Sequence, residues 1–176
     1  MKKIRSFIVI VIIIIVSLFL VKIIDIINSK KCYDEYYRDV PVIGKINVSW
    51  TNIPQNYDEK LELADCAFLG KVKNIKETLY RNGIWVKPFV KNYDVYTIYE
   101  VEVLENIKGN NEINSIIEII QMGGINKNKK SATLINDAIR LVDNEIYKFF
   151  PEKIEFEGEF YLDVSKPNLI EIVKNN

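Results

Sequence analysis

Residues 93–108 read YDVYTIYEVEVLENIK, the clearest β-strand pattern in the chain. One series of side chains recurs at every second position and alternates with a series that includes Glu100 and Glu102. A period of two places each series on its own face of a strand, so we expect one face to pack on a core and the glutamate face to meet water. The first series is Val95, Thr97, Tyr99, Val101 and Val103.

The segments before this strand are also rich in strand-forming residues. Residues 66–78 alternate in the same way, and Arg81-Asn82-Gly83 is a turn signal. Residues 84–92 contain Pro88, so we expect them to form a loop or an edge excursion.

The segments after it continue the pattern. Residues 113–121 read as a strand, and Gly123-Gly124 predicts a bend or bulge where a side chain would restrict the backbone. Further strands are expected at residues 42–50, 145–150, 156–164 and 169–173.

Two short segments have helical features. Residues 56–65 begin with Asn56 and Glu59 at capping-box spacing. Residues 133–142 carry apolar side chains at helical spacing. The chain is therefore predicted to be mainly β, with one or two short helices. The spacing of the turn signals favours a closed antiparallel barrel or a sandwich.

The N-terminal region has a different composition. Residues 6–21 carry no charge, and apolar residues continue to Ile27. We predict a cytoplasmic head at 1–5, a single transmembrane helix at 6–27, a tether at 28–55 and an extracytoplasmic domain at 56–176. A cleaved signal peptide is the alternative. The long apolar run and the absence of a small-residue cleavage site favour a retained anchor.

The Lys and Arg residues on the two sides of the apolar run are nearly balanced, so their distribution does not set the orientation of the helix. The orientation is predicted from the size of the head instead. Five residues are too few to form a domain. We therefore expect the head to stay in the cytoplasm and the C-terminal part to be exported, with the lipid bilayer as a partner through the helix.

Charge and residue types exclude several functions. Residues 32–176 hold 18 Lys and Arg against 23 Asp and Glu, a net charge of −5, which disfavours nucleic-acid binding. The chain has no histidine, and its two cysteines cannot form a four-ligand zinc site. Cys32 and Cys66 could form one disulfide outside the cell, but burial of Cys66 as a small apolar residue is the stronger interpretation.

No motif supports catalysis or cofactor binding. Ser131 follows two lysines in a polar loop, and the sequence gives no sign of the burial that would lower a lysine pKa and activate a Ser-Lys pair. Glu100 and Glu102 are explained by a solvated sheet face. We therefore expect no catalytic residues, no metal ligands, no cofactor and no enzymatic activity.

Four segments carry a resemblance to known domains. They are Leu63–Val72 (LADCAFLGKV), Tyr96–Leu104 followed by Lys108-Gly109, Ile117–Gly124, and Leu141–Phe150 with Asn144 where a glycine is usual. This order resembles uncharacterised exported or membrane-anchored domains of Gram-positive bacteria. It is similar, more distantly, to OB-like barrels of the netrin and tissue-inhibitor-of-metalloproteinases type. The resemblance implies an OB-like antiparallel barrel at the cell surface and no catalytic residues. The inhibitors' disulfides and metal-chelating N-terminal cysteine are missing here.

A candidate binding segment lies between the turn signal and the main strand. Trp85 and Phe89, together with Lys87 and Lys91, combine aromatic anchors with cationic neighbours in a place where OB-like barrels often carry a ligand loop. The alternative is that the aromatic side chains fold back over the end of the barrel. From these features we expect an interaction module that binds a protein or another component of the cell envelope. An accessory or inhibitor domain acting on an exported hydrolase is the alternative function.

Overall fold

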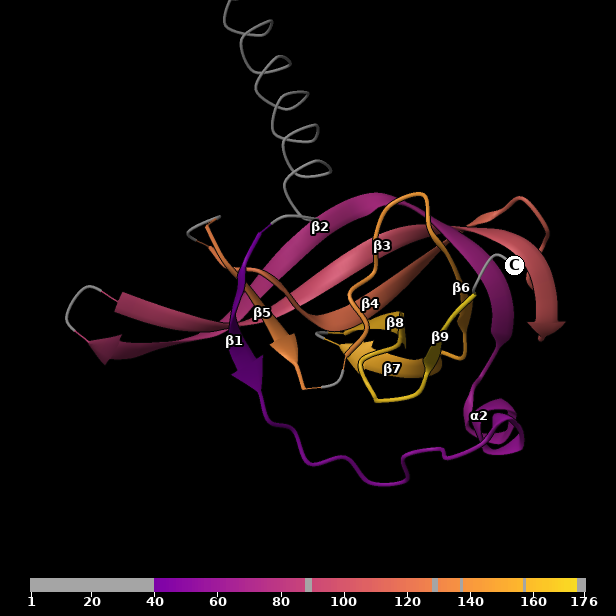
Figure 1. Cartoon of the computed structure of the whole chain (residues 1–176), viewed down its shortest axis with the longest axis horizontal. Coiled ribbons are helices and arrows are strands. Elements are labelled where there is room, and N and C mark those ends of the chain that lie inside the picture. The colour runs from indigo at the N-terminus through magenta and orange to yellow at the C-terminus, as the bar shows by residue number, and fades with distance from the viewer. Residues whose placement is uncertain (1–39, 88–89, 128–129, 137, 157, 174–176) are drawn as a thin grey trace, which may run out of the picture. The chain divides into compact units, whose positions relative to one another are not determined.

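The two longest strands, β2 (Ala67–Lys87) and β3 (Val90–Lys108), form an antiparallel pair at the centre of the sheet in this computed structural model (Figure 1). The structure describes residues 40–173, apart from 88–89, 128–129, 137 and 157. The predicted alternation in β3 is confirmed. The series from Val95 to Val103 is buried, whereas Glu100 and Glu102 are partly exposed.

The opposite face of β3 is partly covered, which the alternation did not predict. Ile98 is buried although it lies on the glutamate face. On the same face the ring of Tyr96 lies 4.7 Å from the ring of Phe156, which belongs to the C-terminal hairpin. That hairpin therefore gives this face of β3 an apolar contact near Tyr96, while the part of the face that carries Glu100 and Glu102 stays partly exposed to solvent.

Seven further strands complete the sheet in the described part of the chain. They are β1 (Val42–Ile46), β4 (Ile116–Ile125), β5 (Ala132–Ile135), β6 (Ile146–Phe149), β7 (Glu152–Phe156), β8 (Glu159–Asp163) and β9 (Ile170–Ile172). The strand order is β1-β5-β4-β3-β2-β6-β9, and β8 pairs with both β4 and β7. β1 lies within the range that we predicted as a tether.

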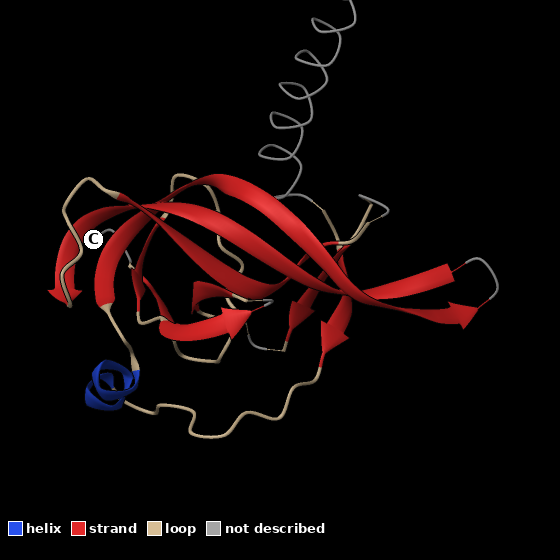
Figure 2. Ribbon diagram, turned by 180° about the vertical axis from the view of Figure 1, so that it is seen from behind, coloured by secondary structure: helices blue, strands red, loops and turns tan. Residues whose placement is uncertain are grey.

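The sheet curls into a half-barrel, as Figure 2 shows from behind. The prediction of a mainly β, barrel-like fold is confirmed, but the pairing is not wholly antiparallel. β1 runs parallel to β5, and β8 runs parallel to β4. Among the described strands, β1 and β9 end the order without pairing to each other. Parallel pairs join segments that are distant in sequence, so the local turn signals could not predict them.

The predicted turn at Arg81-Asn82-Gly83 is wrong, because β2 continues through it as a bulge. Arg81 pairs with Asp94 and Ile84 pairs with Asn92, so β2 has one extra residue there. Asn82 takes the left-handed conformation, with a φ of 49°. The ladder then resumes as far as the pair Lys87–Val90, so residues 84–87 are strand and not the expected loop.

The glycine pair in β4 behaves as predicted. Gly123 and Gly124 have φ of +109° and +143°, and there β4 leaves the ladder with β3 and pairs with β5. The helix predicted at 133–142 is wrong. Its first residues form β5 between β1 and β4, so sheet pairing on both sides overrides the helical spacing of the apolar side chains.

Helix α2 (Tyr57–Leu63) confirms the predicted capping box. The Asn56 side chain accepts a hydrogen bond from the Glu59 backbone N–H at 2.9 Å, and the Asn56 amide donates to the Glu59 carboxylate at 2.7 Å. At the other end, Lys108 donates to the carbonyl oxygens of Leu61 and Ala64, which would otherwise lack helical partners.

The predicted transmembrane segment at 6–27 lies outside the described residues. Within the described part of the chain, no helix is both long and apolar enough to cross a bilayer, since α2 has seven residues. The described residues all belong to one compact unit, Tyr37–Asn176.

Candidate functional site

The β2–β3 hairpin extends beyond the rest of the sheet as an arm, which we define as residues 81–94 (Figure 1). Two large apolar side chains in it are exposed, Ile84 by 67% and Trp85 by 62%. They are neighbours in a strand and so point to opposite faces. The arm therefore presents apolar surface on both sides, which distinguishes it from a strand that covers a core.

The base of the arm is held by specific contacts with β4 and the loop that follows it. The Tyr80 hydroxyl donates to the Ile125 carbonyl oxygen at 2.9 Å, and the rings of Tyr80 and Tyr93 meet edge to face with centroids 6.1 Å apart. The Lys127 ammonium lies 4.7 Å from the centroid of the Tyr93 ring. Asn82 donates to the Asp94 carboxylate at 2.8 Å across the bulge.

Gly83, at the base of the arm, lets the Tyr93 ring pack closely against the backbone of β2. A Cβ on Gly83 would lie 2.7 Å from Cε1 of Tyr93, inside van der Waals contact. The Tyr93 ring thus contacts both Gly83 and the Lys127 ammonium. The arm is therefore anchored at its base and exposed towards its end.

The predicted binding residues belong to this arm, and Trp85 is the one among them whose side chain the structure describes. Trp85 is exposed and pairs with Lys91, and Lys87 pairs with Val90. The side chains of Lys87 and Lys91, and all of Phe89, lie outside the described residues. The alternative, in which the aromatic residues fold back over the barrel end, does not hold for Trp85. Whether the four residues form one binding surface stays a prediction.

Sequence reasoning missed two members of this surface, Ile84 and Lys127. Ile84 was treated as part of a loop. No local pattern in the sequence singles out Lys127, because its contact with the Tyr93 ring joins residues 34 positions apart. A continuous apolar run through residues 84–86 was the available signal for Ile84.

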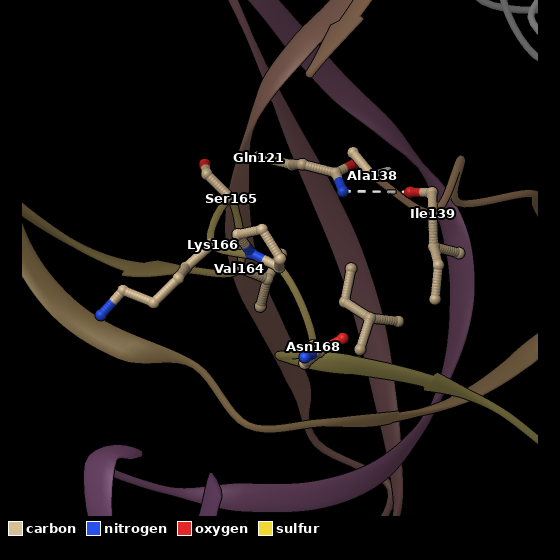
Figure 3. A pocket seen from close by; sticks show the side chains of 9 residues that line it. Gln121, Ala138, Ile139, Val164, Ser165, Lys166 and Asn168 are labelled. Atoms are coloured by element: carbon tan, nitrogen blue, oxygen red, sulfur yellow. Dashed lines mark hydrogen bonds between the residues drawn. The ribbon is translucent and has the colours of Figure 1, made fainter. Parts of the chain in front are cut away.

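A small pocket lies elsewhere, between the middle of β4 and the loops around residues 139 and 165 (Figure 3). Its volume is about 50 Å³, room for only a few water molecules. The amide of buried Gln121 points across it and donates to the Ile139 carbonyl oxygen at 3.0 Å. Ser165 accepts from the Met122 N–H at 2.7 Å, and Lys166 pairs with Glu152 at 2.6 Å. These polar groups form hydrogen bonds and an ion pair within the protein, so we assign the pocket a structural role.

One carboxylate beside this pocket has a perturbed pKa. Burial raises the pKa of Asp163 above its ordinary value, while hydrogen bonds from the Ser165 side chain and backbone N–H act in the opposite direction. Nearby Glu152 raises the pKa and Lys166 lowers it. The group organises the turn between β8 and β9, so we assign it a structural role.

The predicted burial of Cys66 is confirmed. Its thiol is buried and forms no disulfide with any other described residue, and burial raises the pKa of the thiol, so the reactive thiolate is disfavoured. Cys32 lies outside the described residues, and its pairing with Cys66 stays untested. No group of three or more potential ligands among His, Cys, Asp and Glu that could hold a metal ion occurs in the described ranges.

Comparison with models of protein families, with curated proteins and with solved structures finds no match to this chain. The arm with its anchored base is therefore identified from geometry alone.

Proposed function

We propose that this protein is a membrane-anchored, extracytoplasmic interaction module that uses the β2–β3 arm to contact a component of the cell envelope and does no chemistry. The observation that carries the proposal is the exposure of Ile84 and Trp85 on an arm whose base is fixed by Tyr80, Tyr93 and Lys127. Large apolar side chains on a preorganised element are typical interface anchors. The apolar segment at 6–27 supports the membrane location.

The OB-like assignment is part of this proposal. Support for it comes from the curled sheet and from the long β2–β3 pair that carries the arm. The two parallel strand pairs depart from an up-and-down antiparallel barrel.

Site-specific photo-crosslinking on intact cells tests the proposal. A photoreactive phenylalanine analogue replaces Trp85 in the full chain, and in a matched control it replaces Phe160, which is 66% exposed on β8. We expect discrete adducts at position 85 and few at position 160. Equal labelling of the two positions, or the absence of both protein and lipid adducts at position 85, would contradict the arm as the contact surface.

Two further measurements address the location and the alternative function. External protease should remove the C-terminal domain from intact cells, and its survival would contradict the extracytoplasmic location. If the adducts contain an exported hydrolase, an assay of that hydrolase with and without the full chain distinguishes an accessory or inhibitor role from simple attachment.

A further inference from the structure

Positive charge gathers at the end of the domain that carries the arm. Residues 32–176 have a net charge of −5, yet the arm and the β4–β5 loop (residues 126–131) together hold six Lys and Arg and one Asp. Of these cations, Lys127 and Lys130 are exposed in the structure. The full set is Arg81, Lys87, Lys91, Lys127, Lys129 and Lys130, opposed by Asp94. A cationic end on an acidic domain is complementary to an anionic partner.

The chain joins the sheet at this same end. The Pro41 carbonyl oxygen accepts from the Ala132 N–H at 2.9 Å, and Val42 pairs with Ala132 directly after the β4–β5 loop. Ala132 in turn pairs with Ile125, the residue whose carbonyl oxygen receives the Tyr80 bond at the base of the arm. Backbone pairing, together with the hydrogen bond from the Tyr80 hydroxyl, therefore links the start of β1, the β4–β5 loop and the arm.

The length of chain before β1 limits how far this end can move from the predicted membrane segment. Twelve residues separate Ile27 from Val40. At about 3.5 Å per residue, they span roughly 45 Å even when fully extended. With residues 6–27 in the membrane, as predicted, the start of β1 lies within roughly this distance of the bilayer, at the end of the domain that carries the arm and the β4–β5 loop.

The apolar part of the arm is better suited to insertion into the headgroup layer of a bilayer than to contact with a flat protein surface. Ile84 and Trp85 are exposed on opposite faces of the hairpin. A flat partner would cover one of these faces, whereas a lipid interface surrounds an inserted hairpin on both. Tryptophan is enriched at membrane–water interfaces, and lysine side chains extend from such depths to the phosphate level.

We infer that the partner of the arm is the bilayer surface itself, with Ile84 and Trp85 entering the interface while Lys127 and Lys130 contact anionic lipid headgroups. This inference deepens the proposed function and rests on it, because it assumes the membrane anchor and the arm as the contact surface. The domain then lies against the membrane through a second, reversible contact in addition to its anchor.

Fluorescence of the full chain in vesicles tests the inference. The chain has two tryptophans, and Trp50→Phe leaves Trp85 as the single reporter. That change is mild because Trp50 is half-buried and its indole N–H has no hydrogen-bond partner. The variant is reconstituted in phosphatidylcholine vesicles with or without phosphatidylglycerol, each also prepared with nitroxide-labelled lipid as a quencher.

We expect a blue shift and strong quenching of Trp85 in the anionic vesicles, weaker effects in neutral vesicles, and reversal by high salt. Lys127→Glu with Lys130→Glu should reduce the quenching severalfold. Lys45→Glu with Lys153→Glu changes the charge equally outside the arm and loop and should leave it unchanged. Salt reversal in the Trp50→Phe chain alone serves as the readout if the loop variant folds poorly.

Failure of the inference can be distinguished from failure of the proposed function. Absence of quenching in both lipid mixtures overturns the inference. Protein adducts at position 85 on cells would then keep the arm as a contact surface with a protein partner, whereas absence of both quenching and adducts removes the proposed function too. Quenching that is insensitive to phosphatidylglycerol and salt overturns the role of the lysines in headgroup binding.

Discussion

The hydroxyl of Tyr80 reaches past strand β3 and donates a hydrogen bond of 2.9 Å to the carbonyl oxygen of Ile125, the last residue of β4. This bond fixes the base of the arm to the end of the neighbouring strand. Tyr80→Phe keeps the ring contact with Tyr93 and removes only the hydroxyl. We expect a loss of about 1 kcal/mol in the free energy of unfolding, because a partly buried carbonyl loses its side-chain donor.

Urea unfolding of the full chain in detergent measures this loss. Tyr161→Phe is the matched control, since its hydroxyl bonds to the exposed Glu159 two residues away. We expect the control to stay within about 0.5 kcal/mol of the wild type. Equal effects of the two changes would show that the Tyr80 bond does not hold the arm.

A second prediction concerns the bend in β4. A Cβ on Gly124 would collide with Oγ1 of Thr97, whose hydroxyl already donates to the Gly123 carbonyl oxygen at 2.7 Å. Gly124 also has a φ of +143° that other residues rarely adopt. We expect Gly124→Ala to cost about 2 kcal/mol or more, by overpacking and backbone strain together.

Gly158→Ala separates the two contributions. Gly158 has a φ of +85°, and nothing lies within 4 Å of its Cβ position. Strain alone should then cost about 1 kcal/mol in the same unfolding measurement. A Gly124 variant that is no less stable than the Gly158 variant would contradict the clash with Thr97.

These glycines show how far the sequence determines the fold. The bend at Gly123-Gly124, the capping box of α2 and the two-faced pattern of β3 depend on neighbouring residues, and all three were predictable. The bulge at Asn82 was not, because the same residues suit a hairpin turn. Ile84 pairs with Asn92 and Trp85 pairs with Lys91, so β2 continues past Asn82 as a longer strand.

The candidate site likewise contains residues that the local sequence indicates and contacts that it does not. Trp85 and its lysine neighbours stand out in the sequence because aromatic and cationic side chains alternate locally. The contacts of Tyr80 with Ile125 and of Lys127 with Tyr93 join distant segments. The sheet order creates both contacts, so the anchored base became visible only in three dimensions.

A third prediction follows from the burial of Cys66. In a Cys32→Ser chain, Cys66 is the only thiol, and burial raises its pKa. We expect alkylation by iodoacetamide to be at least about tenfold slower in the folded chain than in urea, because the buried thiol is seldom ionised or accessible. Mass spectrometry follows the modification. Similar rates in the two conditions would mean that the start of β2 opens freely.

The last prediction concerns Asp163, whose pKa is raised by burial above its ordinary value of 3.8. A raised pKa means that the folded state binds the proton more tightly than the unfolded state. The stability that this adds is fully present below about pH 3.8 and is lost as the pH rises through the folded pKa. Asp163→Asn keeps an oxygen that can accept the bonds from Ser165 and removes the titration.

Urea unfolding of both chains over a pH series isolates this group, because the other carboxylates contribute equally to both. We expect the free energy of unfolding of Asp163→Asn, relative to the wild type, to increase as the pH rises above 3.8 and then to become constant. A relative stability that decreases over the same interval would mean that the bonds from Ser165 and the charge of Lys166 outweigh burial. The folded pKa of Asp163 would then lie below its unfolded value.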